Sequence, residues 1–304
     1  MILPYLHYDV FTGQALAGNQ LAVFPDGRDL DSGTMQRVAR EMNFSESTFV
    51  LPAERDDTDA RMRIFTPSVE MPMAGHPTIG STFALAQAGV IAPRLERFVF
   101  GLNVGPVAVD LEWSDAQLRF AWMTQGRPEF GASADRAPVA HALGLDVDDV
   151  RSELPVQQVS CGVPYLIVPL RDQAAVDRAA TDHGALRRLQ QATGVDLPLY
   201  LFAPSVPGSR ILDPGSRVLS CRMFAPGLGV LEDPGTGSAA GPLGAYLVRH
   251  GVVGSDGPWR IVIEQGVVMG RPSRIEVVIT GSPEAMVVKV GGEAVLVGRG
   301  ELFL

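Results

Sequence analysis

The chain of 304 residues contains the same strand–turn–helix motif twice, with the two copies about half the chain length apart. The first copy consists of MRIFTP, a short apolar strand that ends in a turn, followed by AGHPTIGS, which leads into a helix. AGHPTIGS contains a polar residue, a proline, a glycine and a serine in that order. In the second copy, CRMFAP and EDPGTGS have the same form. Phe65 and Phe224 lie 159 positions apart, and His76 and Asp233 lie 157 apart, so the copies differ by a two-residue gap. Such a repeat predicts two similar halves that face each other.

Both copies place small residues at the start of an apolar helix. The first N–H groups of a helix have no intrahelical acceptor, and the helix dipole is positive there, so this end favours a carboxylate or another anion. Two facing halves would bring both helix starts into one cleft, with His76 on one wall and Asp233 on the other. From the first copy alone, a histidine that simply caps its helix is an equally good interpretation of His76.

A glutamate interrupts an apolar, β-branched stretch in the first half, FSESTFVLP. Period-2 alternation places Phe44, Glu46 and Thr48 on one face of this strand. The apolar residues do not decide which face is buried, and the pattern alone favours solvent for Glu46. The matching stretch of the second half, LYLFAP at 199–204, contains no glutamate. Only one half therefore carries this acid, which predicts a functionally one-sided site.

Several classes of function are disfavoured by composition. A formal net charge of −9 without a basic stripe argues against nucleic-acid binding. The histidines are scattered without zinc spacing, and no phosphate or dinucleotide loop is present. Cys161 and Cys221 are too few for a disulfide framework, and their apolar surroundings predict buried free thiols. The start lacks the features of a signal peptide, and no apolar run reaches about 18 residues, so we expect a cytoplasmic protein without a membrane span.

The motifs FSEST, AGHPTIG and EDPGTGSA, together with DVFTGQALAGNQLAVF and EQGVVMGRPS, resemble the PhzF-like, phenazine biosynthesis-type isomerases over nearly the whole chain. That family shares the diaminopimelate epimerase fold. The resemblance implies an α+β protein of two pseudo-symmetric domains, each a β-barrel-like sheet around a central helix, with the active site in the interdomain cleft. The expected domains are 1–124 plus roughly 290–304, and 125–289. It also implies a homodimer.

The resemblance further implies a reaction that needs no cofactor or metal. The enzyme would shift a proton between carbons of a small amino or hydroxy carboxylic acid. Glu46 would be the catalytic acid–base, which reverses the solvent-facing interpretation, and His76 and Asp233 would assist it. The expected substrate-binding residues are Gly75, Thr236, Gly237, Ser238, Asn19 and Gln265. Asn19 is equally explained as a turn residue, and the stretch at Gln265 is better explained as a β-bulge.

Two alternatives belong to other classes. The first is an epimerase or racemase of an amino-acid-like substrate. Diaminopimelate epimerases and related racemases use two cysteines as acid and base, and here His76 and Asp233 occupy those positions. A two-base racemase also needs a base from both halves, and Glu46 has no counterpart, which favours isomerisation. The second alternative is a non-catalytic binding protein, which the presence of all three residues disfavours.

Overall fold

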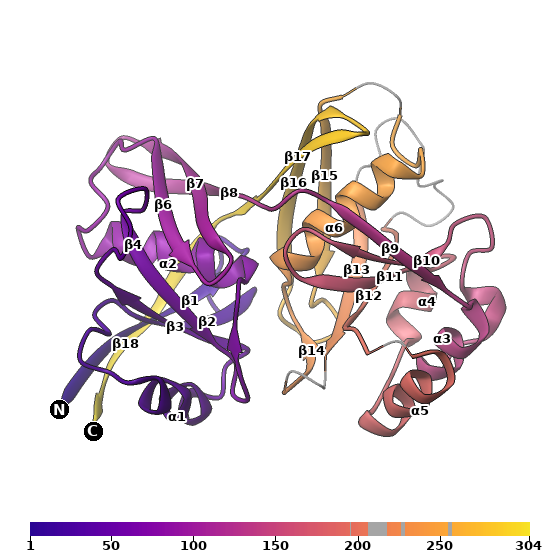
Figure 1. Ribbon diagram of the computed structural model, residues 1–304, viewed down its shortest axis with the longest axis horizontal. Helices are drawn as coiled ribbons and strands as arrows, with labels where there is room; N and C mark the ends of the chain where they lie inside the picture. Colours follow the sequence, from indigo (N-terminus) through magenta and orange to yellow (C-terminus); the bar gives the residue numbers. More distant parts are fainter. Residues whose placement is uncertain (195, 206–217, 226–228, 255–256) are drawn as a thin grey trace.

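Two β-rich lobes lie side by side in the computed structural model, joined by strands that cross between them (Figure 1). The structure describes residues 1–194, 196–205, 218–225, 229–254 and 257–304. The termini meet at the far end of the first lobe, where the Leu304 N–H donates to the Met1 carbonyl. The first lobe therefore contains both ends of the chain.

The first lobe is built from the following elements: β1 (Ile2–Val10), β2 (Asn19–Phe24), α1 (Ser32–Met42), β3 (Glu46–Leu51), β4 (Ala60–Phe65), β5 (Glu70–Met71), α2 (Gly75–Gln87), β6 (Arg97–Leu102), β7 (Gly105–Ser114), β8 (Gln117–Thr124) and the final strand β18 (Ala294–Phe303). Helix α1 begins where the Asp31 carboxylate accepts from the Thr34 N–H, and it ends at Asn43 in the left-handed region. It covers the outer face of the sheet through Met35 and Val38.

The second lobe is built from β9 (Glu129–Ala134), α3 (Arg136–Ala142), the 3₁₀ helix η1 (Val147–Asp149), β10 (Val156–Ser160), β11 (Pro164–Pro169), α4 (Gln173–Arg178), α5 (His183–Thr193), β12 (Leu199–Pro204), β13 (Val218–Ala225), β14 (Val230–Asp233), α6 (Gly237–Arg249), β15 (Trp259–Gln265), β16 (Ser273–Ser282) and β17 (Ala285–Gly292). Helices α3, α4 and α5 lie together at the outer end of this lobe (Figure 1).

The order of paired strands is the same in both lobes. In the first lobe it is β18–β1–β2–β3–β4–β6–β7–β8. In the second it is β9–β10–β11–β12–β13–β15–β16–β17. The parallel pairs β2–β3 and β4–β6 recur as β11–β12 and β13–β15, and all other neighbours are antiparallel. The repeat seen in the sequence is thus a repeat of topology.

The sheets of the two lobes are joined by the antiparallel pair of β8 with β17, in which Thr124 lies opposite Lys289 and Ala121 opposite Gly292. The chain passes from the first lobe to the second after β8 and returns between β17 and β18. This arrangement supports the division into residues 1–124 plus roughly 290–304 and residues 125–289, which we retain as a proposal for the domain boundaries.

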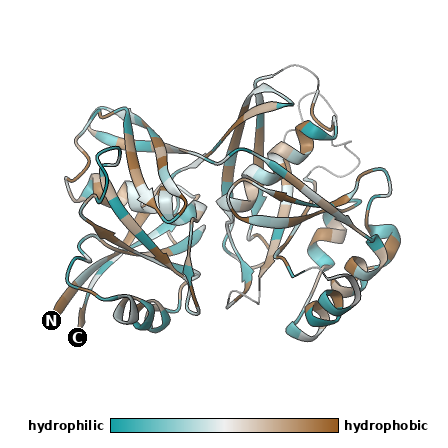
Figure 2. Cartoon of the chain, viewed as in Figure 1, coloured by the Kyte–Doolittle hydropathy of each residue, from teal (hydrophilic) through white to brown (hydrophobic). Residues whose placement is uncertain are grey.

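A buried helix fills the middle of each lobe. Every residue of α2 from Gly75 to Leu85 and of α6 from Gly237 to Val248 is buried. Their sequences are small and apolar all round, which is typical of a helix without a solvent face. In Figure 2, α6 is mostly white and brown, whereas α1 and α5 carry teal along their length. The predicted α+β architecture of two sheets around central helices is confirmed.

The structure differs from the sequence-based expectation at the start of α2. The stretch AGHPTIGS reads as a loop before the helix, but α2 already begins at Gly75, and His76 lies in its first turn. Proline at the third helical position does not prevent this, because the first N–H groups of a helix have no intrahelical acceptor. Within the described ranges, no helix has the length and apolar character needed to cross a membrane.

Candidate active site

The N-terminal ends of α2 and α6 meet where the lobes face each other. Gly75 lies so close to α6 that a Cβ atom built on it would be 2.4 Å from the Ser238 nitrogen. Beside this contact is a small cavity lined by all three predicted catalytic residues and by Gly75, Thr236, Gly237 and Ser238. Its volume is about 20 Å³, which is space for roughly one water molecule. The sequence-predicted residues therefore converge, in a cleft that is closed.

Glu46 is the first residue of β3, and its side chain is 15% exposed. Thr48, on the same face of the strand, is fully buried and hydrogen-bonded to Ser81 of α2 over 2.8 Å. This face therefore looks toward the central helix, and the solvent-facing interpretation from alternation alone is wrong. Burial raises the pKa of the Glu46 carboxyl well above its usual value, and the nearby charge of Asp233 raises it further.

His76 is 2% exposed, and its ring lies between Asn19 and Glu46. Burial lowers the pKa of its imidazole to about 4, against the opposing effects of the Asp233 charge and the Gln20 backbone. The ring is therefore neutral near pH 7. Its Nε2 atom is 3.4 Å from the Glu46 Oε2 atom and has no hydrogen-bond partner in the described parts of the chain.

Asn19 connects His76 with the loop that carries Asp233. The Asn19 Nδ2 atom is 2.8 Å from the Asp233 Oδ1 atom and 3.0 Å from the Gly235 carbonyl oxygen. Both oxygens are acceptors, so the amide nitrogen must face them. It also lies 3.0 Å from the His76 Nδ1 atom, and the roles of the two atoms in this contact depend on the tautomer of the ring. The other ring nitrogen, Nε2, is the atom closest to Glu46.

Asp233 ends β14 and is 4% exposed. Besides Asn19, its carboxylate accepts from the Thr236 hydroxyl over 2.5 Å. Gln265 supports this loop from behind, because its Nε2 atom donates to the Asp233 carbonyl and to the Thr236 hydroxyl over 2.7 and 2.8 Å. The carboxylate is thus held across the cavity from Glu46.

Asn19 and Gln265 do not line the cavity, although both were predicted to bind substrate. Asn19 spans the lobes from the start of β2 to Asp233, and Gln265, only 1% exposed, ends β15 behind Thr236. Their contacts are with residues that do line the cavity. We therefore propose that both position the site rather than touch the substrate.

The two helix starts lie together beside the cavity. Gly75 of α2 lies against Gly237 and Ser238 of α6, and all three line the cavity. Two positive helix ends and their free N–H groups therefore converge on one place. Such an arrangement suits a carboxylate. Of the described residues, no group of three or more His, Cys, Asp or Glu side chains is placed to hold a metal ion.

Tyr165 lines the cavity and was missed from the sequence. Its hydroxyl lies 2.7 Å from the Ser238 hydroxyl, and burial raises the pKa of the phenol. The repeat gave no signal for it. Ala22 pairs with Ser47, and Leu166 pairs with Leu199, the equivalent of Ser47, so Tyr165 occupies the position of Leu21. Because Leu21 is an apolar core residue, the first lobe gave no reason to select Tyr165.

The remaining wall of the cavity is largely apolar. Met71 and Thr66 contribute from the first lobe, and Met223, Ala225 and Val230 from the second. Cys161 and Cys221 do not belong to this wall, and both are free and buried, as predicted. Burial raises the pKa of the Cys161 thiol to about 12. Neither thiol is therefore placed or ionised as the acid–base of a racemase would be.

The strand register shows that the acid has no counterpart in the second lobe. Ser47 lies opposite Phe65 in the first lobe, and Leu199 lies opposite Phe224 in the second. Because Phe65 and Phe224 are equivalent in the repeat, the position of Glu46 corresponds to Pro198. Proline has no ionisable side chain. The site is therefore asymmetric in its chemistry although symmetric in its backbone.

The raised pKa of Glu46 predicts a pH-dependent stability. A carboxyl whose pKa is higher in the folded state stabilises the fold at low pH, and this contribution is lost as pH rises through the folded pKa. Because glutamine does not titrate, the Glu46→Gln variant does not undergo this loss of stability as pH rises. The free energy of unfolding of the variant minus that of the wild type should therefore increase from about pH 5 upward, by at most about 1.4 kcal/mol per pH unit. Urea unfolding at a series of pH values measures this difference.

Glu41→Gln, at an exposed position of α1, controls for the removal of one negative charge. His76 acts in the opposite direction, because its lowered pKa costs stability as pH falls from about 6.5 toward 4. Comparing each variant with the wild type at the same pH cancels the histidine's contribution. A stability difference that decreases between pH 5 and 8 would contradict the raised pKa of Glu46.

Known proteins resemble this chain over its full length. A family model described as "Phenazine biosynthesis-like protein" matches residues 8–300. The trans-2,3-dihydro-3-hydroxyanthranilate isomerase of Pseudomonas fluorescens is 38% identical over 301 residues, which cover 99% of each chain. A solved structure described as the Bacillus anthracis phenazine biosynthesis protein of the PhzF family is 27% identical, with a TM-score of 0.86 and complete coverage of both chains.

A more distant likeness concerns the fold alone. A hydroxyproline epimerase from Agrobacterium vitis is 14% identical, with a TM-score of 0.65 over 99% of this chain and 92% of that one. The predicted epimerase-like fold is thereby confirmed. At this identity the likeness carries no information about the reaction.

Proposed function

The chain belongs to the phenazine biosynthesis-like protein family and is an isomerase, and from that premise we propose that it moves a proton between carbons of a small amino or hydroxy carboxylic acid by general acid–base catalysis. The observation that carries the proposal is the group formed by Glu46, His76 and Asp233 in a closed cleft. Glu46 and His76 approach to 3.4 Å, and the carboxylate of Asp233 is held opposite by Asn19 and Thr236.

Glu46 is proposed to carry the proton. Its ionised carboxylate takes a proton from one substrate carbon, and the electron pair of that C–H bond passes into the conjugated system of the substrate. The protonated carboxyl then returns the proton to another carbon, so the enzyme ends unchanged. A carboxyl with a raised pKa suits both steps, because it is neither too weak a base nor too weak an acid near neutral pH.

The other groups are proposed to bind and polarise the substrate. The Nε2 atom of neutral His76 lies toward Glu46 without a hydrogen-bond partner in the described residues, and in the tautomer with its proton on Nε2 it would donate as negative charge develops. Asp233 can hold a substrate ammonium or exchange a proton in step with His76. The substrate carboxylate would bind at Gly75, Gly237 and Ser238, between the two helix starts.

The cavity lining combines polar residues with the apolar side chains of Met71, Met223 and Val230, a combination suited to a small ring that carries a carboxylate. The relative from Pseudomonas fluorescens acts on trans-2,3-dihydro-3-hydroxyanthranilate, and we propose this compound or a close analogue as the substrate. We also propose a cytoplasmic homodimer, as the family resemblance implies.

The closed cleft implies motion. A cavity of about 20 Å³ cannot admit a ring of this size, so the lobes must separate to bind substrate and close again around it. The crossings after β8 and between β17 and β18 are the places where such a rotation would occur. Solution scattering with and without a bound carboxylate tests this, and unchanged scattering at saturation would contradict it.

Incubation with trans-2,3-dihydro-3-hydroxyanthranilate tests the reaction directly. We expect a protein-dependent change in the ultraviolet spectrum as the conjugated system moves, with NMR identification of an isomeric product of equal mass. Glu46→Gln protein is the control. A product that differs only in configuration at one carbon would instead indicate an epimerase. Tight binding without conversion of this compound and its analogues would indicate a binding protein.

Tyr165 is expected to position Ser238. Tyr165→Phe removes the hydroxyl that contacts the Ser238 hydroxyl over 2.7 Å, and one lost hydrogen bond corresponds to about a tenfold rise in KM at most. Steady-state kinetics measure this rise. The matched control is Tyr246→Phe on α6, the helix that carries Ser238; the Tyr246 hydroxyl donates to the Pro155 carbonyl away from the cavity. A larger rise in KM for Tyr246→Phe than for Tyr165→Phe would contradict the assignment.

A further inference from the structure

The final strand, β18, is the open end of the strand order in the first lobe. It pairs along its length with β1, from Ile2 opposite Phe303 to Val10 opposite Ala294. Within the described ranges, no other strand is in register with it. An unpaired edge presents a row of backbone N–H and C=O groups that can pair with another strand.

The equivalent edge of the second lobe is shorter than β18. Strand β9, its counterpart, is six residues long, and both edge strands have one register shift, β9 against β10 and β18 against β1. Strand β18 has ten residues and contains no lysine or proline. Apolar side chains are exposed at its end, where Phe303 is 78% exposed and Ile2, opposite it on β1, is 58% exposed. This is a surface suited to a protein partner.

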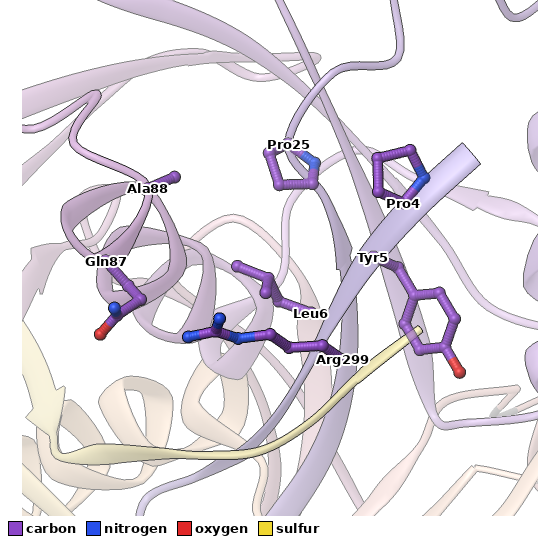
Figure 3. Close-up of a pocket in the computed structure, with 7 residues that line it drawn as sticks. All are labelled: Pro4, Tyr5, Leu6, Pro25, Gln87, Ala88 and Arg299. Carbon is purple, nitrogen blue, oxygen red and sulfur yellow. The ribbon is translucent and has the colours of Figure 1, made fainter. Parts of the chain in front are cut away.

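Two charges on this edge have no partner. Arg299 and Glu301 point to the same face of β18, and neither side chain forms an ion pair or hydrogen bond in the parts of the chain that the structure describes. Figure 3 shows the Arg299 side chain in a hollow between β1 and the end of α2, with Gln87 and Leu6 beside it. The hollow has a volume of about 270 Å³ and no acidic side chain in its lining.

We propose that β18 is the interface of the homodimer, where it pairs antiparallel with β18 of a second copy about a two-fold axis at Gly300. This register places Arg299 opposite Glu301 of the partner subunit, and Gly298 opposite Leu302 of the partner subunit. The strand is therefore complementary to itself in charge. An isologous dimer requires that self-complementarity, because the same residues meet from both sides. Each Arg299 gains the anion that its own chain does not supply.

The proposal deepens the homodimer named under the proposed function and is independent of the reaction. It predicts a sheet that continues from one subunit to the other through β1, β18 and their copies. The partner's Glu301 would lie over the hollow around Arg299. Cross-strand pairs of opposite charge stabilise such a sheet, and like charges placed opposite each other destabilise it.

A charge-reversal cycle tests the register. Arg299→Glu alone and Glu301→Arg alone each convert two attractive pairs into two repulsive ones. Each should therefore raise the Kd of the dimer at least about tenfold, as measured by sedimentation velocity. The double variant Arg299→Glu/Glu301→Arg restores both pairs and should return the Kd to within about threefold of the wild type. Arg119→Glu, at an exposed position of β8, is the control and should leave the Kd unchanged.

Cross-linking provides a second measurement. Directly opposed residues of an antiparallel pair lie within disulfide reach. Arg299→Cys/Glu301→Cys should form a covalent dimer on oxidation, whereas Arg299→Cys alone should not. The native cysteines are buried and do not interfere. A dimer that neither weakens in the single variants nor cross-links in the double variant would overturn the interface but leave the homodimer. A wild type that is monomeric at micromolar concentration would overturn both, and activity measured alongside reports the reaction separately.

Discussion

Glu46→Gln is expected to lower kcat by about 10²- to 10⁴-fold, the usual contribution of a positioned general acid–base. Glutamine keeps the shape of the side chain but cannot take a proton from carbon. The fold should persist, because Glu46 makes no hydrogen bond in the described structure and its nearest polar contact is the His76 ring at 3.4 Å. KM should change little, since the substrate carboxylate is proposed to bind at the helix starts. Steady-state kinetics and single-turnover rates measure both quantities.

The matched control is Glu41→Gln on the exposed side of α1, which removes the same charge far from the cleft. Its kcat should equal that of the wild type. Circular dichroism and the unfolding midpoint establish that both variants are folded. A Glu46→Gln enzyme that retains more than about a tenth of the wild-type kcat would contradict the assignment of Glu46 as the proton carrier.

Gly75→Ala is expected to prevent closure of the cleft. A Cβ atom at this position would lie 2.4 Å from the Ser238 nitrogen and 2.5 Å from the Gly237 carbonyl carbon. Both are backbone atoms of α6, so no side chain can rotate away. Alanine suits the first turn of a helix better than glycine does, so α2 itself should form normally. The helix starts must then move apart, and a displacement of about 1 Å in a catalytic site costs about 100-fold in rate.

The measurement is kcat/KM together with solution scattering at saturating ligand. Gly75→Ala should lower kcat/KM about 100-fold and remain in the open form. Gly254→Ala is the matched control, because a Cβ atom there would have no neighbour within 4 Å. Unchanged kcat/KM in Gly75→Ala would show that the contact between α2 and α6 does not belong to the catalytic state.

The repeat made much of the architecture predictable. Strand, turn and helix signals are local, and their recurrence around Phe65 and Phe224 indicated two equivalent halves before any packing was known. The meeting of His76 with Asp233 followed from that symmetry. The structure places both beside one cavity, together with Glu46. Their roles in catalysis remain proposals.

The orientation of individual side chains was less predictable. Alternation in β3 could not identify its inner face, because that face carries Thr48, a polar residue whose partner, Ser81, comes from α2. Tyr165 reaches the site only because its hydroxyl meets Ser238 across the second lobe. Asn19 looked like a turn residue, and its contact with Asp233 joins segments 214 positions apart. Such contacts depend on how the lobes pack, which local patterns do not encode.

The most direct test of the central claim is the position of the label after turnover in D₂O. The account predicts that trans-2,3-dihydro-3-hydroxyanthranilate, or the analogue found to be the substrate, loses hydrogen at one carbon and gains deuterium at another, and that Glu46→Gln abolishes the incorporation. NMR and mass spectrometry locate the label. Deuterium at the original carbon with inverted configuration would establish an epimerase instead. Incorporation that persists in Glu46→Gln would contradict the role of Glu46 as the group that carries the proton.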